Sequence, residues 1–189
     1  SNVHPDFPEG GVMSQKIDKL EKGDSFSFRG PNGRLEYMGD GVFNIKQLKS
    51  QGGEIIEKKV KNVGMIAGGT GITPMIQIIR AVLRNENDPT KLSLLFANKE
   101  ERDIILRDKL ENPDRDFSDR FEVHYTLDKA EDGWSGFTGF IDEEMIRNTM
   151  PEPSDDTLIL LCGPPKMNSE AVKPALESIG YSPDSIFNF

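Results

Sequence analysis

Two short segments rich in glycine and proline contain the residues best suited to chemistry. The first reads Gly-Gly-Thr-Gly-Ile-Thr-Pro at residues 68–74 and follows an apolar run. Glycines let a phosphate approach the backbone closely, and the helix that follows offers free N–H groups and a partial positive charge. We therefore predict a dinucleotide or phosphate loop. A plain tight turn is the alternative, because Pro74 stands where the usual Gly-x-Gly-x-x-Gly pattern has its third glycine, and Thr70 and Thr73 could simply cap the helix.

The second segment reads Cys-Gly-Pro-Pro-Lys-Met at residues 162–167 and also follows an apolar run. A lone cysteine at such a point is a nucleophile, a ligand or a small residue that lines a pocket. The two histidines are His4, in the first part of the chain, and His124, inside a predicted strand. Without a partner histidine Cys162 is a poor nucleophile, so we expect neither Cys/His catalysis nor a metal site.

The segments belong to a chain whose pattern changes along its length. Residues 25–45 show short apolar alternations cut by turns, as at residues 30–33, which is typical of antiparallel β structure. Residues 46–61 are polar and are interpreted as a linker. The predicted domains are therefore residues 1–61, an antiparallel β part with its linker, and residues 62–189.

The second part alternates apolar strands with helical patterns, which predicts an α/β fold with a doubly wound parallel sheet. Strands are expected at residues 63–67, 92–97, 121–127, 157–162 and 185–189, and helices at residues 74–83, 104–110, 142–148 and 168–179. Ligands of such sheets bind beyond the carboxyl ends of the strands. Both glycine-containing segments lie at such ends.

Composition and charge narrow the classes of partner. The 189 residues include a single cysteine and no apolar run near the ~20 residues of a membrane span, so we expect a soluble, cytoplasmic chain. Residues 1–61 carry ten Lys/Arg and nine Asp/Glu, whereas residues 62–189 carry thirteen and twenty-three. The acidic part should repel nucleic acid and anionic membranes. An acidic protein would approach the first part, where lysines cluster at Lys46, Lys49, Lys58, Lys59 and Lys61; a solvated linker is the alternative.

In combination, these motifs resemble the ferredoxin-NADP reductase superfamily, and within it most closely the NADH-cytochrome b5 reductase family. The resemblance rests on the two segments above, on the terminal Phe189, and on residues 4–15, 28–31, 125–128 and 139–140. It covers essentially the whole chain. It implies an antiparallel FAD-binding barrel followed by an NADH-binding α/β domain. Hydride would pass from NADH to FAD, and single electrons from the flavin to the haem of cytochrome b5, an acidic partner.

The resemblance also implies roles for individual residues. The expected cofactor-binding residues are, for FAD, Gly11, Val12, Met13, Ser14 and Thr73, and, for NADH, Gly68, Gly69, Thr70, Asp128, Phe140, Cys162, Gly163, Pro164 and Met167. Cys162 and Thr70 are the candidate catalytic residues, and we expect Cys162 to position the nicotinamide without attacking it. Asp128 would accept hydrogen bonds from the adenosine ribose and repel a 2′-phosphate, which favours NADH over NADPH. Lys129 beside it weakens that repulsion.

The chain departs from the family pattern at two points. Val12 replaces a basic residue that is common in the flavin loop, and the flavin signature Arg-x-Tyr-Ser/Thr does not occur before Tyr37, Tyr125 or Tyr181. We therefore expect the C-terminal portion of a reductase, which binds FAD weakly when expressed alone and reaches a membrane only through a preceding anchor. The alternatives are the C-terminal flavin portion of an assimilatory nitrate reductase and a flavin-free nucleotide-binding fragment.

Overall fold

A computed structural model describes residues 10–30, 32–111 and 119–189 of the chain. The chain divides between Gly33 and Arg34 into two compact units. Residues 4–9 and Pro31, which contribute to the motifs above, lie outside the described residues. No helix in the described ranges is long and apolar enough to cross a membrane.

The described residues of the first unit form one short helix, α1 (Val12–Asp18), none of whose residues is buried. The predicted strand alternation at Phe26 and Phe28 is wrong, since the two rings pack against each other with centroids 4.9 Å apart and their backbone is not a strand. The ammonium group of Lys16 lies 5.5 Å from the centre of the Phe26 ring. An extended segment forms a stable strand only where a second strand pairs with its backbone, and no described residue pairs with the segment around Phe26 and Phe28.

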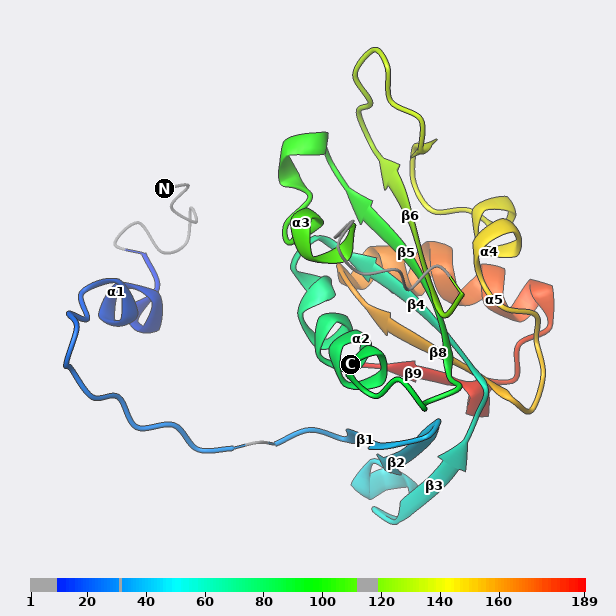
Figure 1. The fold of residues 1–189 in the computed structure, drawn as a ribbon, viewed down its shortest axis with the longest axis horizontal. Coiled ribbons are helices and arrows are strands. Elements are labelled where there is room, and N and C mark those ends of the chain that lie inside the picture. The colour runs from blue at the N-terminus through cyan, green and yellow to red at the C-terminus, as the bar shows by residue number, and fades with distance from the viewer. Residues whose placement is uncertain (1–9, 31, 112–118) are drawn as a thin grey trace. The chain divides into compact units, whose positions relative to one another are not determined.

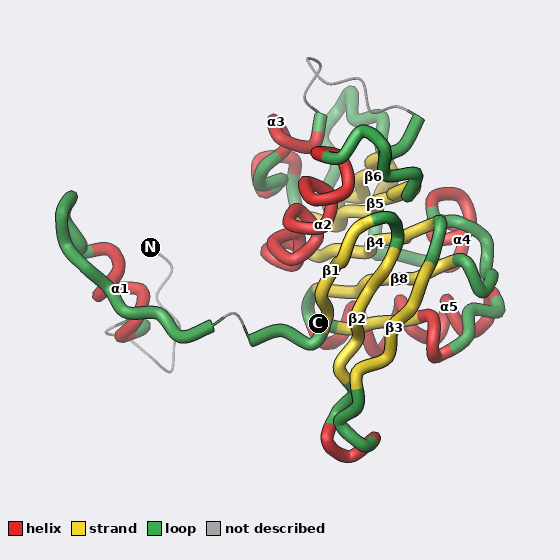
Figure 2. The backbone as a smooth tube through the Cα atoms, turned by 60° about the horizontal axis from the view of Figure 1, so that its bottom comes forward, coloured by secondary structure: helices red, strands yellow, loops and turns green. Residues whose placement is uncertain are grey.

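The second unit begins with an antiparallel sheet in the order β1 (Leu35–Gly39), β2 (Val42–Lys46) and β3 (Ile55–Lys59), shown in Figure 2. The first two strands confirm the antiparallel pattern. The linker predicted for residues 46–61 is wrong over β3, which pairs with β2 along its whole length. Because β3 is exposed at almost every position, its composition lacks the apolar alternation that identifies a strand. The boundary between domains at residue 61 stays a prediction.

The rest of the unit is a parallel six-stranded sheet, which confirms the doubly wound prediction (Figure 1). Its strands, in spatial order, are β7 (Phe137–Thr138), β6 (Phe121–Leu127), β5 (Lys91–Asn98), β4 (Asn62–Gly68), β8 (Thr157–Cys162) and β9 (Ile186–Asn188). The helices are α2 (Ile72–Arg84), α3 (Arg107–Leu110), α4 (Glu143–Thr149) and α5 (Lys173–Ile179). Short 3-10 turns occupy Lys49–Gln51, Gly69–Gly71, Glu101–Asp103 and Pro183–Ser185.

Three of these elements differ from expectation. The sequence pattern did not predict β7, which has only two residues. Helix α3 starts three residues later than predicted, because Leu106 adopts a left-handed conformation with φ of 60°. The last helix opens with a π-helical stretch, Met167–Val172, before α5.

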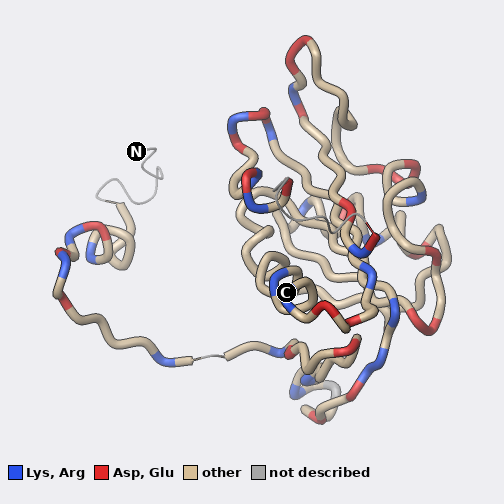
Figure 3. Tube along the Cα trace, viewed as in Figure 1, with Lys and Arg blue, Asp and Glu red and all other residues tan. Residues whose placement is uncertain are grey.

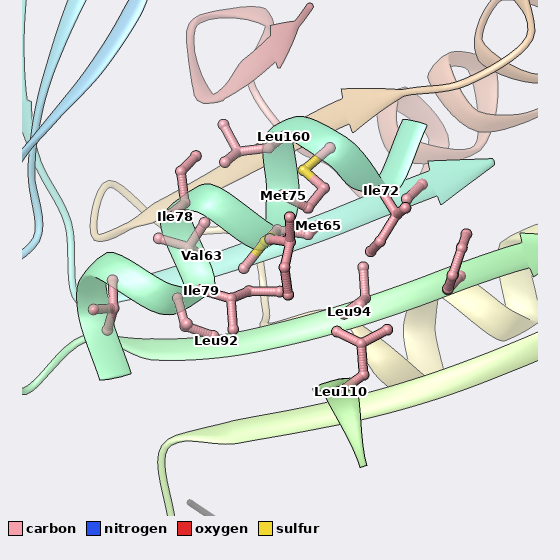
Figure 4. Packing of buried hydrophobic residues seen from close by; sticks show 14 of the residues in the cluster. Val63, Met65, Ile72, Met75, Ile78, Ile79, Leu92, Leu94, Leu110 and Leu160 are labelled. Carbon is pink, nitrogen blue, oxygen red and sulfur yellow. The ribbon is translucent and has the colours of Figure 1, made fainter. Parts of the chain in front are cut away.

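Apolar side chains on both faces of the sheet form the core. On one face, Ile72, Met75 and Ile79 of α2 pack against the central strands, as Figure 4 shows with Met65 and Leu94. On the other face, residues of α4 and α5 pack with those of the same strands: Ile146 and Leu176 with Ile66, Leu95 and Ile159. Central parallel strands are buried on both sides, so they are apolar at nearly every position. This rigid sheet fixes where each strand ends.

A buried carboxylate ties the small sheet to the turn before β5. Asp88 is 1% exposed and accepts hydrogen bonds from the Tyr37 hydroxyl, from the Asp40 N–H at 3.2 Å and from the Thr90 N–H at 3.0 Å. Burial alone would raise the pKa of Asp88, but the hydrogen bonds from Thr90, Tyr37 and Asp40 outweigh it and hold that pKa below its ordinary value. The ionised form is therefore the one that the fold stabilises.

We expect Asp88→Asn to lower the free energy of unfolding at pH 7 by about 2 kcal/mol, because it weakens hydrogen bonds to a buried charge. A depressed folded-state pKa stabilises the fold above the unfolded value of about 3.9, and this contribution is lost as the pH falls through the folded pKa. In urea unfolding, the difference between parent and variant should thus shrink below about pH 4. Asp40→Asn, which keeps the Asp40 N–H, is the control. An equal difference at both pH values would contradict the assignment.

Candidate functional site

The structure brings the two glycine-containing segments together at the carboxyl edge of the parallel sheet. Strands β4 and β8 are neighbours, and the last pair of their register is Ala67 with Cys162. A Cβ atom placed on Gly71 would lie only 2.0 Å from the Cys162 carbonyl oxygen. A Cβ on Gly68 would lie 2.8 Å from both Met167 Sδ and Pro164 Cδ. The glycines are therefore required by close contact between the two loops.

The loop after β4 is open towards solvent where Gly69 turns. Gly69 has a positive φ of 52°, and a Cβ there would meet no atom within 4 Å. Thr70 and Thr73 are exposed, and the Thr73 hydroxyl donates to the Thr70 carbonyl at 3.0 Å. Helix α2, thirteen residues long, starts at Ile72 without a side-chain cap. Its first N–H groups and the positive end of its dipole are suited to an anionic phosphate.

Cys162 lies half-buried at the end of β8. Burial raises the pKa of the Cys162 thiol, so at neutral pH it carries its proton. A protonated thiol is a poor nucleophile. The structure thus agrees with an inert cysteine at this edge, and the expected role of Cys162 in positioning a ligand stays a prediction.

Phe189 ends the chain next to Cys162. Its N–H donates to the Leu161 carbonyl at 3.0 Å, which continues the pairing of β9 with β8. The Phe189 ring is 47% exposed and stands edge-on to the Phe187 ring, with centroids 5.0 Å apart at 82°. The terminal aromatic therefore adds a partly free apolar surface to the same edge.

Asp128 and Phe140 lie further along this edge, beyond β6 and β7. The Asp128 N–H donates to the Asn98 carbonyl at 3.1 Å, and the Lys129 N–H donates to the Lys99 carbonyl at 2.9 Å. The Asp128 side chain is exposed, and Phe140 is 80% exposed. An exposed carboxylate and an exposed ring at adjoining strand ends can contact a ligand that lies along the edge.

The predicted flavin residues belong to the first unit. Gly11 precedes α1, and Val12, Met13 and Ser14 form its first turn, all exposed. The Gln15 N–H donates to the Gly11 carbonyl at 3.0 Å. The exposed Ser14 hydroxyl and the N–H groups of this turn can donate hydrogen bonds to an anion. Thr73, the other predicted flavin contact, belongs to the second unit. The roles of all five stay predictions.

Sequence reasoning missed two buried asparagines near the edge. Asn98, the last residue of β5, is 6% exposed, and neither polar atom of its side chain has a hydrogen-bond partner among the described residues. Asn168 is also 6% exposed, and its Nδ2 donates to Asn188 Oδ1 at 3.1 Å. A signal for Asn98 existed, since it interrupts an apolar run at a strand end. The buried amide without a partner and the uncapped start of α2 fit a polar ligand at this edge.

A separate cleft of about 510 Å³ lies between α3, β6 and the loop before β7. Trp134 lines it, donates from Nε1 to the Phe137 carbonyl at 2.9 Å, and packs edge-on to Tyr125. The Arg107 guanidinium lies 5.8 Å from the centre of each ring. Trp134 is a packing residue here. Among the described residues, no group of three His, Cys, Asp or Glu side chains could hold a metal ion.

Family models match both parts of the chain. Residues 65–173 match the model described as "Oxidoreductase NAD-binding domain". Residues 3–37 match the model described as "Oxidoreductase FAD-binding domain". The first match spans the carboxyl edge from β4 to the π-helical stretch, and the second includes α1.

The proteins that resemble this chain over its whole length are named as cytochrome b5 reductases or as a domain of that kind. NADH-cytochrome b5 reductase 3 of Rattus norvegicus is 50% identical over 188 residues, which cover 100% of this chain and 62% of that protein. NADH-cytochrome b5 reductase 2 of the same species is 47% identical over 100% of this chain and 67% of its own length. The crystal structure of the cytochrome b5 reductase domain of Ulva prolifera nitrate reductase superimposes with a TM-score of 0.87 at 40% identity, covering 100% of this chain and 70% of that one. The chain therefore spans about three fifths of the length of the first of these relatives.

Proposed function

Since the chain belongs to the NADH-cytochrome b5 reductase family, we propose that its full-length protein passes hydride from NADH to FAD and then single electrons to cytochrome b5 or a similar acidic haem protein. The observation that carries the proposal is the carboxyl edge of the parallel sheet. At this edge the loop after β4 is in close contact with the loop after β8. The two loops bring together the open turn at Gly69, the uncapped start of α2 and the thiol of Cys162.

The proposal assigns the nucleotide to this edge. The N–H groups at the start of α2 would bind the pyrophosphate of NADH, with Gly68, Gly69 and Thr70 against it. Asp128 would accept hydrogen bonds from the adenosine ribose of NADH, and the exposed ring of Phe140 would contact the same, adenosine end of the nucleotide. Cys162, Gly163, Pro164 and Met167 would hold the nicotinamide end.

The proposal assigns FAD to Gly11, Val12, Met13, Ser14 and Thr73. When bound, FAD supplies the conversion of a two-electron donor into a one-electron donor. The chain's own contribution is to place the nicotinamide and to exclude water around it. Cys162 suits this because its pKa is raised by burial and the thiol stays neutral. Thr70, exposed at the turn, would contact the nucleotide directly.

We propose that the acidic partner docks on lysines of the small sheet. Lys46 and Lys59 are exposed, and the β2–β3 register places them on one face, at opposite ends. Figure 3 shows the Lys and Arg positions of the chain in blue, several of them in the part that forms the small sheet. Lys58 and Lys61 are less available, since Lys58 donates to the Asp184 carbonyl at 3.0 Å and Lys61 pairs with Asp156 at 2.6 Å. Partial burial also lowers the pKa of Lys58. Opposite charges on the two proteins would speed their encounter.

The proposal includes no nucleic-acid partner, because the larger, acidic part of the chain would repel a polyphosphate. It places the protein in the cytoplasm, and any membrane attachment in a preceding anchor. A single cysteine at a half-buried position suits a reducing compartment.

The test is anaerobic stopped-flow reduction of the full-length protein. We expect a purified yellow protein with one FAD, whose visible flavin absorbance is bleached by NADH and restored by ferric cytochrome b5. Ionic strength provides the control, because slow reoxidation at high salt with unchanged bleaching would separate docking from hydride transfer. A full-length protein that binds NADH but never flavin would be the flavin-free alternative.

A nitrate reductase portion is the second candidate, and the TM-score of 0.87 to such a domain favours it. The greater identity to free-standing reductases, 50% against 40%, favours the first. The two differ upstream of the chain, where a nitrate reductase has haem and molybdenum domains. A haem spectrum in the full-length protein itself would decide for the second candidate.

A further inference from the structure

Arg34 connects the small antiparallel sheet to the last strand of the parallel sheet. Its Nη2 donates to the Asn188 carbonyl at 3.1 Å, and its guanidinium carbon lies 4.9 Å from the centre of the Phe187 ring. Figure 2 shows the C-terminus beside the start of β1, and Arg34 directly precedes the first residue of that strand, Leu35. A planar guanidinium can stack and donate at once, which an ammonium group cannot do.

Asn168 also binds Asn188, through the Asn188 side chain. Its Nδ2 donates to Asn188 Oδ1 at 3.1 Å and lies 3.5 Å from the Gly163 carbonyl, in the loop after Cys162. Asn168 is 6% exposed and lies in the π-helical stretch Met167–Val172. Such a stretch is rare, and it frequently accompanies a functional site. Asn188 is thus held by its backbone through Arg34 and by its side chain through Asn168.

The strand held in this way is weak on its own. Strand β9 has three residues and is the last strand of the sheet, paired only with β8. A three-residue strand at the edge of a sheet opens readily unless further contacts hold it. Phe189 follows directly and lies beside Cys162 through its hydrogen bond to Leu161. Any fraying of β9 would therefore displace the Phe189 ring from the carboxyl edge.

We propose that Arg34 and Asn168 are positioning residues, which hold Phe189 at a fixed place beside Cys162 and so fix the geometry of the nicotinamide end of the site. This inference rests on the proposed function for its catalytic consequence, but not for the anchoring itself. A donor carbon that is displaced by about 1 Å loses rate far more than affinity. The two residues should therefore affect the rate of hydride transfer more than the binding of NADH.

The first measurement needs no nucleotide. The full-length protein is treated with an uncharged maleimide, and labelling of the Cys162 peptide is followed by mass spectrometry. We expect Asn168→Leu to raise the labelling rate about tenfold, because Asn188 Oδ1 loses its partner and β9 opens more often. Arg34→Leu should raise it as well, and Arg34→Lys should restore part of the protection. Glu170→Gln, at an exposed position in the same π-helical stretch, is the matched control and should label at the parent rate.

The second measurement is stopped-flow flavin reduction over a range of NADH concentrations. We expect Asn168→Leu and Arg34→Leu to lower the limiting rate about tenfold while the NADH dissociation constant changes less than about threefold. Melting temperatures confirm that each variant is folded. If Asn168→Leu fails to fold, the same two measurements on Arg34→Leu and Arg34→Lys test the proposal, since Arg34 is only half-buried.

Each outcome decides one statement. Parent-like labelling in both Leu variants would overturn the anchoring. Faster labelling with parent-like limiting rates would overturn the positioning role. A parent protein that NADH never reduces would defeat the proposed function, while the labelling result would still decide whether β9 is anchored by these residues.

Discussion

Gly71→Ala is expected to lower the melting temperature by about 6–12 °C and to weaken nucleotide binding at least tenfold. The added Cβ would lie 2.0 Å from the Cys162 carbonyl oxygen and 2.6 Å from its carbon, both backbone atoms of β8. The backbone of β8, which is paired with β4 on one side and β9 on the other, cannot rotate away as a side chain can. The loop must move instead, at a cost of about 3 kcal/mol, the upper end of typical overpacking.

The same movement would shift the start of α2, where the phosphates of the nucleotide are proposed to bind. Differential scanning calorimetry measures the first effect, and titration with NADH the second. Gly180→Ala is the control, because Gly180 has a φ of 107° at the end of α5 and open space around it. That variant should lose some stability and no affinity. If Gly71→Ala matched it in both measurements, the close contact of the two loops would be refuted.

The parallel sheet could be predicted because its strands are buried on both faces. Strands β4, β5 and β8 are apolar over most of their length, and α2 repeats apolar residues at helical spacing, from Met75 to Leu83. Burial imposes such patterns on the sequence directly. The predicted strand ends then located the two loops, and the structure brings both to one edge.

Elements that depend on pairing could not be predicted in this way. Strand β3 is exposed, and β7 has two residues, so neither buries enough apolar surface to leave a pattern. The reverse error occurred at Phe26 and Phe28, whose alternation suggested a strand although their rings pack on each other. A period of two indicates a strand only where a partner strand is present.

The site shows the same limit. The segments that contain Cys162 and Gly71 were identified because their residue types and spacing are unusual. The close approach of Gly71 to the Cys162 backbone explains the glycine. Arg34 and Asn168 gave no such signal, because each acts through a hydrogen bond to Asn188. Asn188 is 154 residues from Arg34 and 20 residues from Asn168 along the chain. Long-range polar contacts are a property of the folded chain, and one sequence alone does not reveal them.

Asp128→Thr is expected to lower the preference for NADH over NADPH, as a ratio of kcat/KM values, by about 10- to 100-fold. The carboxylate is exposed at the end of β6, and its backbone is fixed by the hydrogen bond to Asn98. In the proposed assignment, its removal would take away an acceptor for the ribose hydroxyls, worth about 1.5–3 kcal/mol, and a charge that repels a 2′-phosphate. NADH should become the poorer substrate and NADPH the better one.

The neighbouring lysines make the direction of this change informative. Lys129 and Lys99 are exposed and joined through their backbones beside Asp128, so the variant would leave two cations near the ribose. Steady-state kinetics of the full-length protein with both nucleotides measures the ratio. Asp132→Thr removes the same charge four residues further along the exposed loop and should leave the ratio unchanged, because only a carboxylate at the strand end can reach the ribose. Equal effects of the two substitutions would mean that net charge, and not the position of Asp128, selects the nucleotide.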